Sequence, residues 1–203
     1  MARNIPNSES QYEDEAFEGL FFAKAELERS HFYGCTFEEG VLRESVLREC
    51  RFIECVFRGC DLSLAQVFGS AFSSSRFERC QVVGVNWTHA EWGDDGLKMP
   101  AGYFDSALNH STFLGLNLKG ISIVDCAAAD VDFRDANLRQ ADFGGTDLSG
   151  SLFNHTDLTD ADLSRARDYR IDPSQNTLRN AKFSLPEALS LLYSMDIRLI
   201  DSP

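Results

Sequence analysis

Residues 131–163 read VDFRDANLRQADFGGTDLSGSLFNHTDLTDADL, and a five-residue unit repeats through them without interruption. A large apolar residue forms the centre of each unit: Phe133, Leu138, Phe143, Leu148, Phe153, Leu158 and Leu163. A small or compact residue stands two positions earlier: Val131, Ala136, Ala141, Thr146, Ser151, Thr156 and Ala161. A period of five matches neither the 3.6 of a helix nor the 2 of a strand. Four units, each with one short extended run and one corner, would close a square coil, so the pattern predicts a solenoid.

The same unit extends back to Phe17 through sixteen earlier repeats, the last of which is centred on Trp92. Read every twentieth residue, these centres sort into walls in which similar side chains recur, such as Phe17, Phe37, Phe57 and Phe77. We therefore expect twenty residues per coil, with the centre and the small residue pointing inward. The other three positions of each unit would face water.

Residues 93–102, GDDGLKMPAG, interrupt the repeat and are typical of a loop. The centres fall one residue later after this segment, from Tyr103 and Leu108 onwards. One extra residue within a coil would place Phe113 on the Phe72 wall, whereas a wholly extruded loop would reassign the walls. The segment is either a bulge that absorbs the shift or a projecting contact loop with these exposed side chains: Asp94, Asp95, Leu97, Lys98 and Met99.

The two ends of the chain differ from the repeat region, which we place at residues 15–183. Residues 1–14 are polar, have no evident centres and predict a tail or a partial cap. In residues 184–203, Ser184 to Glu187 predicts a capping box at the start of a helix. The apolar residues of this segment either cover the open end of the solenoid or form a homodimer interface: Leu185, Leu189, Leu192, Met195, Ile197 and Leu199.

The chain of 203 residues is acidic, with a formal charge of −13 from 19 basic and 32 acidic residues. This charge argues against direct binding of nucleic acid and is compatible with a basic partner or with ordinary solubility. No long apolar run and no apolar N-terminal segment is found, so a cytoplasmic location is expected.

The cysteines and histidines do not indicate a catalytic or metal site. All six cysteines stand at the small inward position, which predicts buried, reduced packing residues: Cys35, Cys50, Cys55, Cys60, Cys80 and Cys126. A metal or redox pair is geometrically conceivable where Cys35 and Cys55, or Cys60 and Cys80, stack. Packing explains their spacing without it. The four histidines are dispersed at outward positions, and no phosphate loop or nucleophile motif is present. We expect no enzyme activity, cofactor or metal.

The outward positions of the later coils are rich in carboxylates. The candidate partner-binding residues are Asp130, Asp132, Asp135, Asp142, Asp147, Asp157, Asp160 and Asp162. Acid is not confined to them, because Glu39, Glu44, Glu49 and Glu54 occupy successive corner positions in earlier coils. For such a rod to imitate DNA, its charge must concentrate where the partner touches.

The repeats from Glu15 to Leu163 resemble the pentapeptide-repeat family, whose fold is a right-handed quadrilateral β-helix. Narrower features resemble the branch that protects topoisomerases, namely the Qnr and MfpA proteins and the immunity proteins for microcin B17 and albicidin. These features are residues 84–88 with Trp92, the single loop after it, and the sequence from Phe183 to Ile197. The albicidin-resistance protein looks most similar, although Qnr proteins often carry two loops and one is evident here.

This resemblance implies a homodimeric rod joined through its C-terminal ends that imitates duplex DNA on DNA gyrase or topoisomerase IV. The aspartates from Asp130 to Asp162 would then bind the enzyme, with the loop as a second contact, and relieve poisoning by a drug or peptide toxin. The alternative is a structural pentapeptide-repeat scaffold that binds another protein, because the fold alone does not specify a function.

Overall fold

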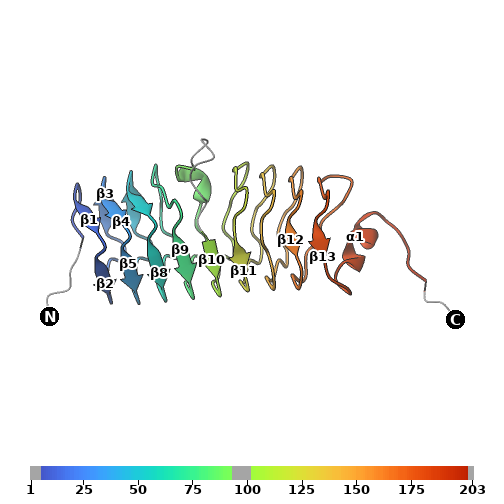
Figure 1. The fold of residues 1–203 in the computed structure, drawn as a ribbon, viewed down its shortest axis with the longest axis horizontal. Helices are drawn as coiled ribbons and strands as arrows, with labels where there is room; N and C mark the ends of the chain where they lie inside the picture. Colours follow the sequence, from blue (N-terminus) through green and yellow to red (C-terminus); the bar gives the residue numbers. More distant parts are fainter. Residues whose placement is uncertain (1–5, 93–101, 201–203) are drawn as a thin grey trace.

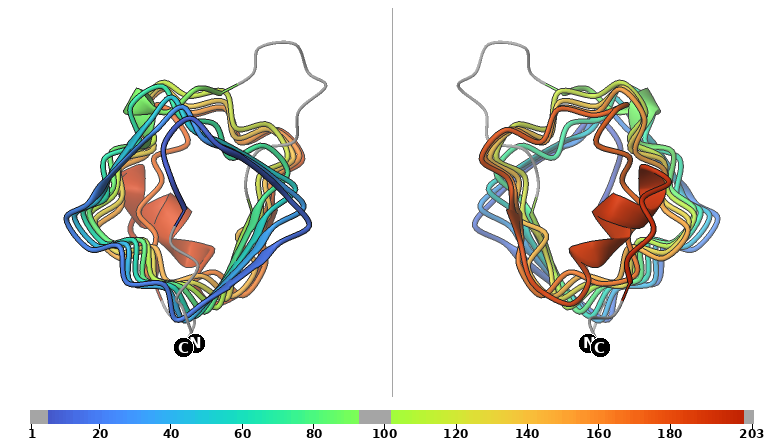
Figure 2. Two further views of the ribbon diagram at one scale, coloured as in Figure 1. Left: turned by 90° about the vertical axis from the view of Figure 1, so that its left-hand side faces the viewer. Right: turned by 90° about the vertical axis from the view of Figure 1, so that its right-hand side faces the viewer.

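The computed structural model describes residues 6–92 and 102–200, which form an all-β solenoid of about eight turns. Figure 1 shows the coils stacked along one axis, with the two termini at opposite ends. Figure 2 shows that each coil is four-sided and that the coils superimpose when viewed along the axis. The predicted all-β solenoid is therefore confirmed. No helix in the described part of the chain is long and apolar enough to cross a membrane.

Short parallel strands form the walls, and each pairs with the strand one coil away. The strands are β1 (Gln11–Glu13), β2 (Ala16–Glu18), β3 (Glu26–Glu28), β4 (His31–Tyr33), β5 (Thr36–Glu38), β6 (Val46–Arg48), β7 (Arg51–Ile53), β8 (Val56–Arg58), β9 (Arg76–Glu78), β10 (Gly102–Phe104), β11 (Ile123–Val124), β12 (Asp162–Leu163) and β13 (Lys182–Phe183). A 3-10 turn, η1 (Trp87–His89), and one helix, α1 (Leu189–Ser194), complete the secondary structure of the described residues.

We name the four walls of the solenoid faces A to D in chain order. Face A contains the six-stranded sheet β2-β5-β8-β9-β10-β11 and continues through β12 and β13. Face B is formed by single bridges from Phe21 to Arg167, and face C by β3, β6 and the bridges that end at Leu152. Face D contains β1, β4 and β7 and continues through bridges to Thr177.

Stacked aromatic rings fill much of the core. The rings of Phe17, Phe37, Phe57 and Phe77 lie parallel, with neighbouring centroids 4.7–4.9 Å apart, which is the spacing of paired strands. The residue two positions after each centre has a positive φ, between 46° and 75°, from Glu9 to Gly84 and again from Asp105 to Arg165. The left-handed backbone at these residues turns the chain through each corner, although most of them are not glycine.

The small inward residues also form hydrogen bonds between coils. Ser70 Oγ donates to the carbonyl of Leu47 and accepts from the backbone N–H of Cys50, one coil below. Thr146 and Ser151 repeat this arrangement, and the thiol of Cys60 donates to the carbonyl of Phe37. Serine, threonine and cysteine thus satisfy corner backbone groups that the strand ladders leave free. All six cysteines are buried, as their register predicts.

The coil that contains the predicted loop has twenty-six residues in place of twenty. Phe57 pairs with Phe77, but Phe77 pairs with Tyr103, and Asn86 pairs with Thr112. Phe113, Phe133 and Phe153 therefore stack above Trp87 on face C, and not on the Phe72 wall. The alternative with one extra residue is wrong, because this coil contains six extra residues. The centres that follow it therefore stack on different walls, as in the second alternative.

The first coil begins earlier than residue 15. Strand β1 pairs with β4, and the ring of Tyr12 stacks on Phe32 as a further pentad centre. This centre is hard to recognise in the sequence because it is a tyrosine, and the polar residues before it contain no earlier pentad centre. Residues 6–10 form the cap, where Ser8 Oγ accepts from Glu28 N and Ser30 Oγ donates to the carbonyl of Asn7.

The C-terminal helix begins later than the sequence predicts. Ser184 Oγ accepts from the backbone N–H of Arg165 in the previous coil, so it does not cap the helix. Helix α1 has Ala188 as its N-cap, without a side-chain hydrogen bond, and the peptide bond before Pro186 is cis. The capping-box prediction is therefore wrong. Leu191 packs against the core and Ser194 Oγ donates to the carbonyl of Ile171, which attach the helix to the last coil.

Tyr103 provides a test of the core. Its ring is fully buried against Phe77, and its hydroxyl has no hydrogen-bond partner among the described residues. We expect Tyr103→Phe to raise the free energy of unfolding by about 1 kcal/mol, because it removes an unsatisfied polar group. Urea unfolding at pH 7 measures the change.

Tyr12→Phe is the matched control, because the Tyr12 hydroxyl accepts a 2.8 Å hydrogen bond from Asn7 N. This variant should lose about 1 kcal/mol. Destabilisation by both substitutions would show that the Tyr103 hydroxyl has a partner in the folded protein.

Candidate partner-binding surface

The eight predicted aspartates do not lie on one surface. Asp142 and Asp162 are neighbours on face A, Asp147 lies on face B, Asp132 on face C and Asp157 on face D. Asp130, Asp135 and Asp160 occupy three different corners, where φ is positive. The twenty-residue coil separates pentads into four walls, so acids that are close in the sequence face different directions.

Five of these aspartates also support the backbone. The Oδ1 atom of Asp142 accepts a 2.9 Å hydrogen bond from the N–H of Gly144, two residues later on the same wall. The same hydrogen bond is formed by Asp132, Asp147, Asp157 and Asp162. Asn137 forms it with an amide oxygen. The position before the centre therefore favours aspartate or asparagine for a structural reason.

Arginine and lysine side chains neutralise half of the predicted set. Arg134 donates to Asp132 Oδ2 at 2.7 Å, and Arg139 donates to Asp157 Oδ2 at 3.2 Å. Lys182 pairs with Asp162 and Arg167 with Asp147, while His155 and His110 lie beside Asp135 and Asp130. In the described part of the chain, only Asp142 and Asp160 of the eight have no basic side chain within 4.0 Å.

Some of these contacts lower carboxyl pKa values. The hydrogen bond from Arg134 lowers the pKa of Asp132, and the backbone N–H of Ser149 lowers the pKa of Asp147. Hydrogen bonds from the hydroxyl and N–H of Ser164, followed by the contact with Lys182, lower the pKa of Asp162. All three remain ionised at neutral pH.

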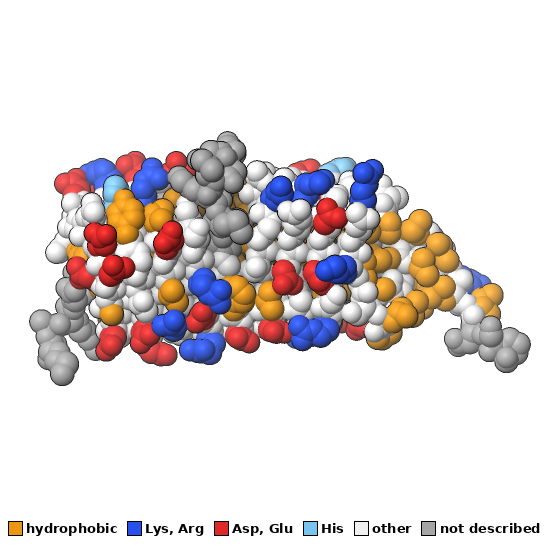
Figure 3. Space-filling view, viewed as in Figure 1, with side chains coloured by type: hydrophobic (Ala, Val, Ile, Leu, Met, Phe, Trp, Pro, Cys, Tyr) orange, Lys and Arg blue, Asp and Glu red, His pale blue; other side chains and the backbone are white. Residues whose placement is uncertain are grey.

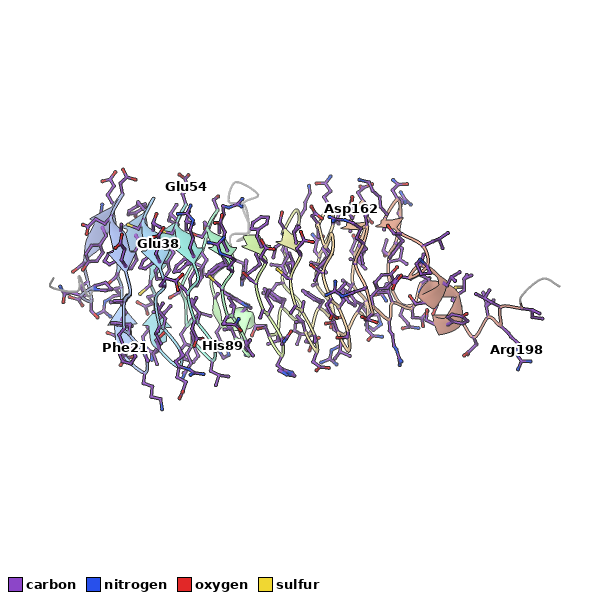
Figure 4. All side chains as sticks on the ribbon, turned by 90° about the horizontal axis from the view of Figure 1, so that it is seen from below. Phe21, Glu38, Glu54, His89, Asp162 and Arg198 are labelled. Carbon is purple, nitrogen blue, oxygen red and sulfur yellow. The ribbon has the colours of Figure 1, made fainter. Side chains whose placement is uncertain are left out.

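Carboxylates without a basic neighbour gather instead on face A. Of the acids on or beside face A in the described chain, eight form no ion pair within 4.0 Å: Asp14, Glu18, Glu39, Glu54, Asp105, Asp125, Asp142 and Asp160. By contrast, Arg43, Lys24 and Arg48 pair with acids on or beside faces B and C. Figure 4 shows Glu38, Glu54 and Asp162 on one side of the rod and Phe21 and His89 on the other.

The net charges of two faces, each counted with both of its bounding corners, differ in the same direction. Face A carries twelve acids and five bases, a net charge of −7: Asp14, Glu15, Glu18, Glu38, Glu39, Glu54, Glu78, Asp105, Asp125, Asp142, Asp160 and Asp162 against Arg58, Arg76, Arg79, Arg165 and Lys182. Face D carries nine acids and five bases, a net charge of −4: Glu9, Glu13, Asp14, Glu49, Glu54, Glu91, Asp135, Asp157 and Asp160 against Arg29, Arg51, Lys119, Arg139 and Arg179. Face A is therefore the more acidic of the two.

Sequence reasoning missed most of face A. The stacking period of twenty residues identifies which corners share a wall, but the twenty-six-residue coil changes the assignment of Asp105 and Asp125. Ion pairing cannot be seen in the sequence, because Arg58 reaches Glu38 in one direction and Glu78 in the other. The predicted loop contacts Asp94, Asp95, Leu97, Lys98 and Met99 lie outside the described residues.

The predicted dimer residues lie at one end of the rod. Leu185 is 77% exposed, Met195 48%, Ile197 41% and Leu199 38%, and Tyr193 and Ile200 are exposed beside them. Leu189 and Leu192 are half-buried. Figure 3 shows hydrophobic side chains gathered at this end, past the last coil. The end is therefore capped only in part by α1 and leaves an apolar surface.

The described residues contain no cluster of three or more histidine, cysteine or acidic side chains arranged to hold a metal ion. The histidines are outward, as predicted, with His89, His110 and His155 exposed and His31 half-buried. Burial raises the pKa of Cys55 and of Cys126 to about 12, so these thiols are protonated.

Family models match two parts of the chain. A pentapeptide repeat region matches residues 25–98, and a model of eight pentapeptide repeats matches residues 132–167. The chain is a pentapeptide-repeat protein. None of the curated proteins compared with it matches in sequence.

Solved structures share the fold of this pentapeptide-repeat protein. A trypsin-treated variant of QnrB1, a plasmid-mediated fluoroquinolone resistance protein, aligns with a TM-score of 0.51 and 20% identity, over 99% of this chain and 96% of that one. HetL, involved in heterocyst differentiation regulation in the cyanobacterium Nostoc, aligns with a TM-score of 0.46 and 15% identity, over 87% and 89% of the two chains.

Substitutions of Asp142 can separate the effect of its charge from the effect of its hydrogen bond to the backbone. Asp142→Asn keeps an oxygen for the Gly144 N–H, so we expect it to change the free energy of unfolding by less than about 0.5 kcal/mol. Asp142→Ala removes the acceptor and should cost about 1 kcal/mol. Thermal and urea unfolding measure both variants. Equal stability of the two variants would contradict the backbone role.

Asp162 gives a pH-dependent test. Its folded-state pKa lies below the ordinary value of 3.8, so its stabilising contribution is complete above that value and is lost as the pH falls through the folded-state pKa. Asp162→Asn should therefore destabilise the protein at pH 7 and have a much smaller effect at pH 2.5. Asp105→Asn is the control, because Asp105 has no ion pair among the described residues. An Asp162→Asn effect that does not vary with pH would exclude the charge-linked contribution.

Proposed function

We propose that this protein binds the DNA-binding surface of a type II topoisomerase, DNA gyrase or topoisomerase IV, in place of duplex DNA. By occupying that surface it would protect the enzyme from a poison of the quinolone, albicidin or microcin type. The observation that supports this proposal most strongly is the concentration of unpaired carboxylates on face A. The structural likeness to QnrB1, a fluoroquinolone resistance protein, supports it at a coarser level.

The charge on face A suits a flat basic partner. Its eight unpaired carboxylates average about one per coil, or one per about 4.8 Å along the rod, and they are distributed over the wall and its two bounding corners. A DNA strand carries one phosphate per about 3.4 Å, so face A resembles one edge of a duplex more closely than the whole of it. Because eight of its carboxylates have no basic neighbour in the described chain, they are free to pair with lysine and arginine side chains of a partner.

The proposal includes a homodimer joined through the apolar C-terminal end, which would place two acidic faces on one longer rod. The protein would act in the cytoplasm, where these enzymes work, and would have no catalytic role of its own. Its contribution is charge and shape.

A second candidate function is a scaffold that binds another protein. Phe21 on face B is 60% exposed and Leu64 at the next corner is 54% exposed. Exposed apolar side chains on a rod of this kind suit a protein partner, and no basic surface would be required. Recovery of a protein other than a topoisomerase subunit, dependent on Phe21 and Leu64, would favour this function.

The test is a comparison of two variants with equal charge change. The face A variant combines Glu18→Gln, Asp105→Asn, Asp125→Asn and Asp142→Asn. The control combines Asp130→Asn, Asp132→Asn, Asp135→Asn and Asp147→Asn, on faces B and C. Binding to purified gyrase is measured at about 150 mM salt, together with supercoiling in the presence of a fluoroquinolone.

We expect the face A variant to bind gyrase at least about tenfold more weakly and to lose protection, because it removes unpaired charges. The control should lose less than about threefold, because its carboxylates lie off face A and arginine side chains already neutralise two of the four, Asp132 and Asp147. Equal losses would mean that net charge alone determines binding. Unchanged binding by both variants would exclude charge mimicry.

A further inference from the structure

A pocket lies where the last coil meets the C-terminal helix. It has a volume of about 290 Å³ and is lined by Asp168, Tyr169, Pro186, Glu187, Leu189, Ser190 and Tyr193. It is separate from face A and from the core of the solenoid. Its lining combines aromatic and aliphatic side chains with two carboxylates.

Two polar atoms beside this pocket lack partners. Tyr169 is only 2% exposed, and its hydroxyl has no hydrogen bond within the described chain. The hydroxyl of Ser190 is buried and is also unpartnered there. Burial raises the pKa of Tyr169 to about 12, so its phenol is neutral and its oxygen can accept a hydrogen bond. Buried polar atoms without partners are rare in folded proteins, so two of them beside one pocket need an explanation.

The pocket is suited to a guanidinium group. Asp168 and Glu187 form no ion pair among the described residues, so two carboxylates are available to a cation. The ring of Tyr193 offers a face for a planar cation, and Pro186 and Leu189 can contact an aliphatic stem. An arginine carries five N–H donors, enough to reach a carboxylate and a hydroxyl together.

The chain has an arginine without a partner at the same end. Arg198 lies in the exposed segment after α1, between Ile197 and Leu199, and forms no ion pair with the described residues. Figure 4 shows Arg198 beyond α1, on the far side of the helix from the last coil. Figure 1 shows the segment running away from the rod. In this arrangement Arg198 extends away from the pocket of its own chain.

We propose that Arg198 of a second copy occupies this pocket, and that the two copies exchange their C-terminal segments reciprocally. In a twofold dimer each segment enters the pocket of the other copy, so both pockets are filled by one symmetric contact. Ile197 and Leu199 would cover the exposed Leu185 and Tyr193 beside the pocket. The inference rests on the dimer part of the proposed function and specifies how the copies recognise each other.

A second copy suits the pocket better than an unrelated basic protein because the same chain end carries both halves of the contact. The pocket supplies carboxylates and unpaired hydroxyl groups, and the segment supplies the cation and the apolar residues that flank it. In the single chain Asp168 and residues 197–199 are exposed and Glu187 is half-buried, while the two hydroxyl groups lie buried behind them. The pocket and the segment complement each other in charge and polarity.

The test is a charge exchange read by analytical ultracentrifugation of the full-length protein. Arg198→Glu and Glu187→Arg should each weaken the dimer at least about tenfold. The double variant, Arg198→Glu with Glu187→Arg, should restore the dissociation constant to within about threefold of the original. Arg179→Glu, on face D, is the matched control and should leave the dimer unchanged. Tyr169→Phe should weaken the dimer without lowering the unfolding midpoint at concentrations where the protein is monomeric.

Several outcomes would overturn the inference: a protein that stays monomeric at about 100 μM, a dimer unaffected by Arg198→Glu, or single variants that the double variant does not rescue. Capture of a different basic protein in the pocket, with the chain remaining monomeric, would also overturn it. The measurement involves no topoisomerase, so a failure of gyrase binding leaves its result intact.

Discussion

Backbone hydrogen bonds between successive coils are the interaction on which the structure depends. Each short strand is too small to be stable alone and pairs only with the equivalent strand one coil away, so every coil must keep the same path. This requirement places each pentad centre above another, as in the parallel rings of Phe37 and Phe57. It also demands a left-handed residue at every corner. Where six residues are added, they are accommodated in one coil and the register on both sides is preserved.

The same stacking organises the surface charge. Side chains one coil apart are close neighbours, so like charges in a column repel unless a cation lies between them. Arg58 between Glu38 and Glu78 is one such arrangement. On faces B, C and D most acids have a basic neighbour, whereas face A leaves many carboxylates unpaired. Unpaired like charges destabilise the chain on its own, and such local destabilisation is typical of a surface that binds a partner.

The sequence predicted the candidate site less well than the fold. It identified the aspartates before Phe143 and Leu163 as outward, and they are outward. It could not show that Asp132 and Asp157 have arginine neighbours, or that Asp142 supports the N–H of Gly144. Tyr12 was not recognised as a centre because no repeat precedes it. The start of α1 was predicted too early because Ser184 accepts a hydrogen bond from Arg165 and does not cap the helix.

The five-residue pattern was enough to predict the solenoid, the twenty-residue coil, the inward cysteines and the outward acids, because this period is a local property that every coil repeats. Which acids share a face, which of them are neutralised and how the walls continue past residues 93–102 could be seen only in the folded coils. Those features depend on how many residues the interrupted coil contains and on which side chains lie one coil apart. The acidity of face A and the pocket beside α1 therefore emerge only when the coils are stacked.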